Sequence, residues 1–474
     1  MVPMTDSSTP NSPTPENARA ALTAQMPFVK DALTELVAFR SVHSTPGLEQ
    51  DNADAAAWVV NAFRTVGVPV EPHVTSDGST AVIGLREPAA GYPTILLYSH
   101  FDVQPASDVE NWTSSPWELT ERDGRWYGRG AADCKGHVVM HLAVLRALGE
   151  LTATYPDLAK VGVRVVVEGS EERGGYGLED LLASSPDLFA ADVFLIADSG
   201  NDAIGVPAIG TALRGTAPVT VTVETLNQPM HSGQYGGAAP DALLSLIKLL
   251  ATLHDDDGLV AVDGLDSDAR WEGRGPDAAT FRADAGVLDG VDILGQAQGL
   301  NPNDLTVARP SITVTGLDSL SVADAVNAVV ARAAAHVSLR VPPGMDATTA
   351  QDALVTHLEN HVPQHARMSI ARDTLASPFL ADITGPALAR LTRALADAYG
   401  APDTAEIGSG GSIPLCNALL AQFPDAELGL FGIEEPGCRI HSADESVSPS
   451  EIAAMGTAEL LFLARTAAEV AAKQ

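Results

Sequence analysis

Cysteine is scarce in this sequence, which has only three such residues among 474, Cys134, Cys416 and Cys438. They are too few for a disulfide framework, and no pair has the C-x-x-C spacing of a redox or zinc motif. This scarcity fits a reducing compartment, so we expect a cytoplasmic protein. Long apolar runs are missing too: none approaches the roughly 20 residues of a membrane span.

Basic residues are also scarce. The chain has 28 Lys and Arg against 61 Asp and Glu, which gives a formal net charge of -33. Nucleic acids and anionic membranes attract proteins through clustered basic side chains, so neither is expected as a partner. Residues 1–17 are rich in Pro, Ser and Thr and contain no apolar stretch. They predict a disordered leader and not a secretion signal.

Hydrophobic residues make up 45% of the chain, enough for a sizeable core, and the length exceeds that of a typical single domain. Apolar strands alternate with helical patterns, the first of which is expected over 18–42. This order predicts an α/β domain with a mainly parallel sheet, built from residues 18–212 and 376–474. The patterns between them, 213–375, predict an inserted, smaller α+β domain.

Acidic residues and histidines stand where the predicted strands of the first domain end. The strand in TILLYSHFDVQP is followed by His100 and Asp102, VRVVVEGSEE ends with Glu171 and Glu172, and DVFLIADSG reaches Asp198. Ligands of a parallel sheet bind outside the carboxyl ends of its strands, so these side chains are expected to meet.

A further acid, Asp133, lies in the Gly-rich turn GRGAADCKG, just before an apolar helical run. The helix N-terminus that follows would stabilise its charge. Taken singly, each of these residues has an ordinary explanation, such as a turn acid, a strand cap or a surface histidine. Together with His441 they form a set of His and carboxylate donors without thiolate. Such donors suit paired Zn, Mn or Co ions that stay open for catalysis.

The runs SHFDVQP, RWYGRGAADCKGH, EGSEERGG and IADSG resemble those of the M20 family of dinuclear zinc peptidases, most closely its dipeptidase and carnosinase-like branch. The similarity continues through MHSGQYGG, HVSLRVPPG, GSGGSIP and GIEEPGCRIHSADE, so it covers nearly the whole chain after the leader. It implies that the inserted domain is a lid and dimerisation domain.

The resemblance also implies a role for each residue of the set. It implies two Zn²⁺ per subunit, with Mn²⁺ or Co²⁺ as alternatives. Five ligands are implied: His100 and Asp198 at one metal, Glu172 and His441 at the other, and Asp133 at both. Glu171 is then the general base that acts on a metal-bridging water, and Asp102 supports His100. The chemistry agrees, since two cations about 3.5–4 Å apart lower the pKa of a shared water.

Residues of the substrate side are implied in the same way. His231, on a Gly-flanked turn, would reach into the active site of a partner subunit and stabilise the tetrahedral oxyanion, so a homodimer is expected. Arg340, at the end of an alternating strand, would clamp the carboxylate of the substrate. The backbone of the turn GSGGS, with Gly410, Gly411 and Ser412, could cradle a carboxylate as well.

The leading hypothesis is a metal-dependent dipeptidase that hydrolyses the peptide bond of dipeptides or short peptides with a free C-terminal carboxylate. The alternative on the same fold is an N-acyl amino acid deacylase, such as a deacetylase or desuccinylase. A third hypothesis is a binding protein that has lost activity, but it would lack Glu171 or a ligand, and none is missing. Asp198 favours the dipeptidase, because relatives of the deacylase type often have Glu there. Cys134, where many relatives have Asp or Met, is interpreted as a packing residue.

Overall fold

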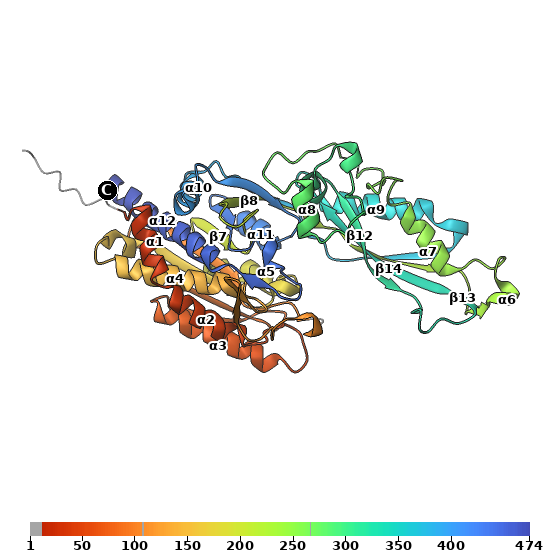
Figure 1. Cartoon of the computed structure of the whole chain (residues 1–474), viewed down its shortest axis with the longest axis horizontal. Helices are drawn as coiled ribbons and strands as arrows, with labels where there is room; N and C mark the ends of the chain where they lie inside the picture. The colour runs from red at the N-terminus through yellow and green to blue at the C-terminus, as the bar shows by residue number, and fades with distance from the viewer. Residues whose placement is uncertain (1–11, 107–108, 266) are drawn as a thin grey trace, which may run out of the picture. The chain divides into compact units, whose positions relative to one another are not determined.

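The computed structural model describes residues 12–106, 109–265 and 267–474, and its elements are labelled in Figure 1. They form two compact units. The first comprises the chain up to Thr211 with Ala381–Ile407 and Pro414–Gln474, and the second comprises Ala212–Leu380 with Gly408–Ile413. The sequence assigns the turn 408–413 to the first domain. It joins the second unit because its backbone bonds to that unit, with Arg214 N donating to Ser409 O at 3.3 Å.

The first unit is built on the mainly parallel strands of a nine-stranded sheet, whose order is β1-β2-β6-β3-β7-β18-β8-β16 with β17 paired to β8; the short β16 is counted with the second unit. The strands are β1 (Val70–Val74), β2 (Thr80–Arg86), β3 (Thr94–His100), β6 (Gly162–Glu168), β7 (Val193–Ala197), β8 (Ala208–Leu213), β16 (Phe379–Leu380), β17 (Ala405–Ser409) and β18 (Glu427–Phe431). The central strands β6, β3, β7 and β18 are parallel, whereas β2 and β8 pair with them antiparallel.

The parallel strands form the centre of the core. Every residue of β3, β6 and β7 is buried. Strands that are covered on both faces read as continuous apolar runs and not as an alternation, which is why these segments stand out in the sequence.

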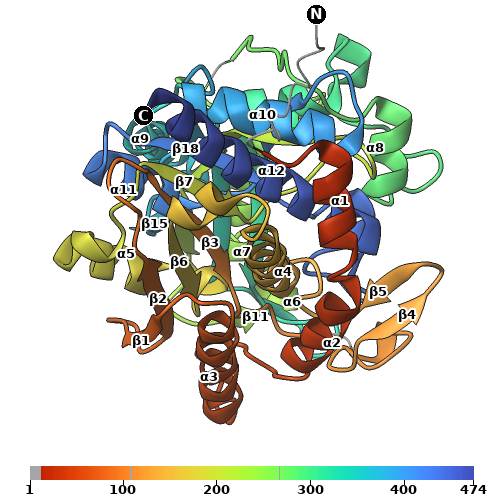
Figure 2. The same ribbon diagram turned by 90° about the vertical axis from the view of Figure 1, so that its left-hand side faces the viewer.

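Helices cover both faces of this sheet. They are α1 (Pro15–Thr23), α2 (Met26–Val37), α3 (Glu49–Thr65), α4 (Lys135–Leu151), α5 (Tyr176–Ser184), α10 (Pro386–Tyr399), α11 (Pro414–Gln422) and α12 (Pro449–Lys473). In Figure 2, α3, α4 and α12 lie on one side of the sheet and α5 and α11 on the other. A small antiparallel sheet adds β4 (Thr120–Arg122), β5 (Arg125–Tyr127) and β19 (Ser446–Val447). Among the described residues, no helix has the length and apolar content to cross a bilayer.

The N-terminal region differs from the sequence-based expectation in two ways. The single helix expected over 18–42 is two helices, α1 and α2, and the second begins with a proline in its first turn. Proline lacks the N–H that a continuous helix would need, so it starts a new helix there. Helix α1 also begins within the expected leader, at Pro15, where Thr14 Oγ1 caps it by accepting from Asn17 N at 3.2 Å. Residues 1–11 of that leader lie outside the described residues.

The second unit is an antiparallel sheet in the order β12-β14-β10-β15 with helices packed on it. Its elements are β9 (Gly215–Thr216), β10 (Val219–Glu224), β11 (Met230–His231), α6 (Ser232–Tyr235), α7 (Ala242–Ala251), α8 (Ala278–Asp284), β12 (Ser311–Asp318), β13 (Ala328–Val329), β14 (Arg332–Val341), α9 (Ala347–His361) and β15 (Arg367–Arg372). Strand β10 alternates between buried and half-buried residues, as expected of a sheet with one covered face. The predicted fold class, α/β with a smaller α+β unit inserted, is confirmed.

Candidate metal centre and active site

The centre of the candidate site is His100, the last residue of β3. Its side chain is fully buried, and its Nε2 lies 3.0 Å from Asp133 Oδ1 and 3.1 Å from Asp198 Oδ1. The other ring nitrogen, Nδ1, lies 3.1 Å from the backbone oxygen of Asp102 and 3.4 Å from its Oδ1. An imidazole anchored through Nδ1 presents Nε2 to a metal in a fixed orientation.

Asp133 faces two imidazoles, one with each carboxylate oxygen. Its Oδ1 lies 3.0 Å from His100 Nε2, and its Oδ2 lies 3.0 Å from His441 Nε2. The same nitrogen of His441 lies 3.1 Å from Glu172 Oε2. Asp133, Glu172 and His441 thus form one group of converging donor atoms, while His100 and Asp198 belong to another. A carboxylate between two such groups has the geometry of a bridging ligand.

Glu171 and Glu172 follow β6 in a short 3-10 turn, Glu171–Arg173. Asp102 holds this turn, because its two carboxylate oxygens accept the N–H groups of Glu171 and Glu172, both at 3.1 Å. Its contacts therefore extend beyond the His100 ring to the backbone of both glutamates. Glu171 Oε2 lies 3.9 Å from His100 Nε2, so this carboxylate lies beside the cluster without a hydrogen bond to that ring.

Negative charge is crowded in this cluster. Burial, followed by the charge of Asp198, raises the pKa of Glu171 well above its ordinary value, and burial also raises the pKa of Glu172 and Asp198. Conversely, hydrogen bonds to Asp133 and Glu172 raise the pKa of His441 to about 10. Buried carboxylates that repel one another need cations nearby. Since the donors are imidazole and carboxylate groups, the residues fit a pair of divalent ions such as Zn²⁺ or Mn²⁺.

Cys134 follows Asp133 and is fully buried. Its Sγ lies close enough to the donor atoms of His100 and Asp198 to form a metal-binding group with them. However, the thiol donates to Ala197 O at 3.1 Å and lies 3.2 Å from His137 Nδ1. Burial raises the pKa of this thiol well above its ordinary value. Metals bind the thiolate and not the thiol, so these contacts agree with the packing interpretation.

Glu434 is an acid of this cluster that the sequence analysis did not select. It follows β18, and its carboxylate lies with those of Asp133 and Asp198 in one group whose oxygens are within 4.8 Å of one another. The signal in the sequence was the pair Glu434 and Glu435 directly after an apolar strand, the pattern that had singled out other acids. The neighbouring Glu435 is different, since it is paired with Arg125 at 2.5 Å.

Glu445 is a second residue that sequence reasoning missed. Its buried carboxylate accepts four hydrogen bonds, from Arg129 Nη1 at 2.7 Å and from the backbone N–H groups of Gly130, Ala132 and Asp133 at 3.0, 3.1 and 3.2 Å. The Gly-rich turn therefore wraps around this carboxylate. Because Glu445 lies in the same loop as His441, it ties the turn that carries Asp133 to the loop that carries the other imidazole. No local pattern could have revealed a contact between residues so far apart in the sequence.

The remaining predicted residues belong to the second unit. His231 is exposed in β11, and its Nδ1 accepts a hydrogen bond from Gly233 N at 3.1 Å. Arg340 lies near the end of β14. Gly410, Gly411 and Ser412 follow β17 in the turn that this unit takes in. The cluster around His100 is thus made wholly of residues from the first unit.

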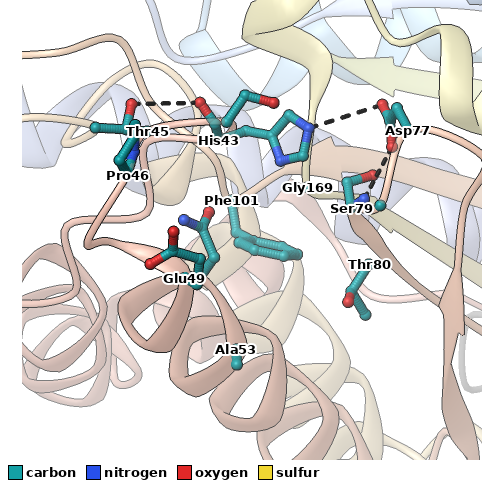
Figure 3. Close-up of a pocket in the computed structure, with 13 residues that line it drawn as sticks. His43, Thr45, Pro46, Glu49, Ala53, Asp77, Ser79, Thr80, Phe101 and Gly169 are labelled. Atoms are coloured by element: carbon teal, nitrogen blue, oxygen red, sulfur yellow. Dashed lines mark hydrogen bonds and ion pairs between the residues drawn. The ribbon is translucent and has the colours of Figure 1, made fainter.

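A cavity of about 520 Å³ lies beside the end of β3 (Figure 3), and none of the predicted metal ligands lines it. The ring of Phe101, the residue after His100, borders it together with Glu49 of α3. On its opposite side, His43 Nε2 lies 4.0 Å from Asp77 Oδ2. Both side chains line the cavity.

The chain is similar to known dipeptidases over nearly its whole length. It is 44% identical over 443 residues to the cysteinylglycine-S-conjugate dipeptidase of Corynebacterium striatum, covering 93% of this chain and 96% of that protein. It is 27% identical over 421 residues to the Beta-Ala-His dipeptidase of Mus musculus, covering 82% and 83% of the two chains. Human carnosine dipeptidase 1 shares its fold, with a TM-score of 0.81, 22% identity and coverage of 96% of this chain and 99% of that one.

A sequence profile of Peptidase family M20/M25/M40 matches residues 96–464. This match takes in every residue of the cluster around His100. It spans well over half of the 474 residues. The chain therefore belongs to peptidase family M20/M25/M40.

Proposed function

We propose that this protein is a dinuclear metallopeptidase that hydrolyses the peptide bond of dipeptides and short peptides with a free C-terminal carboxylate. One observation carries the dinuclear part of the proposal: the two oxygens of Asp133 each lie 3.0 Å from a different imidazole, His100 and His441. A single metal would need only one of these groups. The dipeptidase activity is supported by membership of this peptidase family and by the two relatives described above, both of which are named as dipeptidases.

Two divalent cations are the proposed cofactors, with zinc as the first choice and Mn²⁺ or Co²⁺ as alternatives. His100 and Asp198 would hold one, Glu172 and His441 the other, and Asp133 both. When bound, such a pair would polarise the scissile carbonyl and lower the pKa of a bound water. The protein then has to supply a proton acceptor and substrate-binding groups.

Glu171 is the proposed general base. Its carboxylate lies beside the cluster, and its raised pKa makes it a stronger proton acceptor than an ordinary glutamate, which suits a group that takes a proton from water and later passes it to the leaving amine. Asp102 positions it by holding the Glu171 N–H at 3.1 Å. Removal of Asp102 would therefore disturb the base as well as the His100 ring.

His231 is proposed to stabilise the oxyanion in the active site of a partner subunit, which makes the working enzyme a homodimer. Arg340 and the turn with Gly410, Gly411 and Ser412 are proposed to bind the carboxylate of the substrate. The cytoplasm is the proposed location, and the three cysteines, all of them unpaired and buried, support it.

The name of the 44% identical relative suggests where to look for the substrate. We propose cysteinylglycine and its S-conjugates as the first candidates, since the name of that relative gives as its substrate a dipeptide with a modified thiol and a small C-terminal residue. The deacylase alternative is not favoured, because the relatives compared are dipeptidases by name.

A hydrolysis panel followed by mass spectrometry tests the proposal. It would contain Cys-Gly, an S-alkyl Cys-Gly, other dipeptides, tripeptides, and N-acetyl and N-succinyl amino acids, each with added Zn²⁺, Mn²⁺ or Co²⁺. Cleavage of dipeptides that stops on chelation and returns with metal is the expected result. Cleavage of the acyl amino acids alone would change the proposed substrate and leave the proposed metal site unchanged. Absence of any hydrolysis would argue for a binding protein.

A further inference from the structure

Arg214 is a buried arginine that the function proposed above does not use. It lies at the start of the second unit, just before β9, and only 8% of it is exposed. Its Nη1 donates to Ser311 Oγ at 2.7 Å and to Leu305 O at 3.3 Å, which are neutral acceptors. Among the residues that the structure describes, its Nε has no hydrogen-bond partner. Within the described part of the chain, no carboxylate pairs with this guanidinium.

A second arginine, Arg340, lies next to it. Arg340 is directly opposite Ser311 in the antiparallel pair of β14 with β12, and opposite residues of such a pair point to the same face at Cβ separations of about 4.5–5.5 Å. The hydroxyl that accepts from Arg214 is therefore beside Arg340. Burial, together with the charge of Arg340, lowers the pKa of Arg214 to about 10, so both groups are charged at neutral pH. Arg340 has no acidic partner among the described residues either.

The turn Gly408–Ser412 lies against the same guanidinium. A Cβ at position 410 would be only 2.9 Å from Arg214 Nη2, so glycine is what allows this close approach. The backbone N–H of Arg214 donates to Ser409 O at 3.3 Å. The buried hydroxyl of Ser412 likewise lacks a hydrogen-bond partner in the described ranges. This donor, this hydroxyl and the two positive charges thus belong to the same unit.

A buried guanidinium beside a half-buried one, with no acid paired to either among the described residues, is costly unless an anion accompanies them. We propose that Arg214 is a second specificity-determining arginine of the substrate site, which with Arg340 and Ser412 holds the free carboxylate of the peptide. This inference rests on the proposed function. It adds a second guanidinium group to the single one, Arg340, that the proposed carboxylate site already has. Planar guanidinium groups bind carboxylates with two parallel hydrogen bonds, which gives the strong orientation that a dipeptidase needs.

The test compares a dipeptide with the same dipeptide bearing a C-terminal amide. The variants are Arg214→Met, which keeps the volume without charge, and Arg214→Lys, which keeps charge without the planar fork. The matched control is Arg332→Met, at an exposed arginine at the other end of β14. We expect Arg214→Met to raise KM for the free acid roughly 10- to 100-fold, the range of one charge-assisted hydrogen bond. The amide should change less than about threefold, and kcat should change little.

Arg214→Lys should lie between the wild type and Arg214→Met, and Arg332→Met should match the wild type. An unchanged ratio of acid to amide in both Arg214 variants would overturn the inference while dipeptidase activity persists. Equal losses for acid and amide would also overturn it, since they would indicate a structural role. If Arg214→Met does not fold, Arg214→Lys alone decides by the same ratio.

A binding measurement separates this inference from the proposed function. Thermal unfolding of the wild type and of Arg214→Lys is followed with sodium acetate and with sodium chloride at equal ionic strength. Acetate should raise the unfolding temperature of the wild type more than chloride does, and this excess should be smaller in Arg214→Lys. That result supports a carboxylate site even if no peptide is cleaved. Equal stabilisation by both salts would indicate a site for any small anion and would overturn the carboxylate assignment.

Discussion

Replacement of Glu445 by glutamine should loosen the metal centre although Glu445 is not among the proposed ligands. The carboxylate accepts two N–H groups with Oε1, from Ala132 and Asp133, and two with Oε2, from Arg129 and Gly130. Glutamine has the same shape but offers one oxygen, and its NH₂ group would face two donors. Two of the four hydrogen bonds would therefore be replaced by repulsive contacts.

The magnitude follows from the charge and burial of these groups. A hydrogen bond to a charged group contributes about 1.5–3 kcal/mol, and breaking a buried ion pair costs about 3–5 kcal/mol because one charge remains unpaired. The Arg129 and Glu445 side chains are only 2% and 0% exposed. We therefore expect Glu445→Gln to lower the free energy of unfolding by about 3–5 kcal/mol. Mutation of residues that orient metal ligands typically lowers metal affinity about 10- to 100-fold, and we expect Glu445→Gln to lower it in that range.

Urea unfolding of the metal-free protein gives the first quantity, and competition with a fluorescent chelator gives the second. Glu427→Gln is the matched control. Glu427 also accepts two backbone N–H groups, from Ala387 at 3.0 Å and Leu388 at 2.8 Å, but it does so at the start of α10, where no proposed ligand lies. It should lower stability without a change in metal affinity. Unfolding within about 1 kcal/mol of the wild type and unchanged metal affinity in Glu445→Gln would refute the reasoning.

Four further predictions concern single groups. Glu171→Ala should retain its metal by elemental analysis while kcat falls roughly 10²–10⁴-fold or more, because general base catalysis contributes that much; normal turnover would exclude Glu171 as the base. Cys134→Ala should retain metal affinity, because Sγ is engaged by backbone and imidazole partners, and a large loss in a chelator titration would instead make it a ligand. A mixture of His231→Ala and Glu171→Ala subunits should recover part of the activity if the site is shared between subunits, and no recovery would indicate self-contained subunits. Burial opposes the charged form of Asp77, but hydrogen bonds, the first of them from Thr75, outweigh burial and lower the pKa of Asp77 from 3.8 to about 2. The stabilisation by this carboxylate is complete above about pH 4 and is lost as the pH falls to 2, so the difference in stability between wild type and Asp77→Asn should shrink by about 1–2 kcal/mol over that interval. Stability curves of the two proteins that run parallel from pH 4 to pH 2 would contradict this.

One strand and one helix boundary show what local sequence signals can and cannot predict. The strand β18 forms over an apolar run between turn signals, a pattern that has few other structures open to it. The helix expected over 18–42 is interrupted between α1 and α2, although Pro27 was a visible signal for a new start. The apolar periodicity continued across the break and concealed it.

The sequence by itself determined that an α/β fold would bring acids and histidines to one edge of a parallel sheet, because side chains at the carboxyl ends of neighbouring strands have nowhere else to meet. His100, Glu171, Glu172 and Asp198 follow from that rule. The position of Asp133 between two imidazoles was implied by resemblance to a family and not by spacing.

Only the tertiary structure decided which groups hold these residues in place. Glu445 lies more than 300 residues from the turn that wraps around it, and Arg214 lies 97 residues from Ser311. Neither contact follows from periodicity or propensity, since both depend on the packing of loops that are distant in the chain. A buried carboxylate with four donors, and a buried arginine with no acidic partner in the described part of the chain, are recognised only when the neighbours of the group are known, because the cost of burying a charge depends on the partners that surround it.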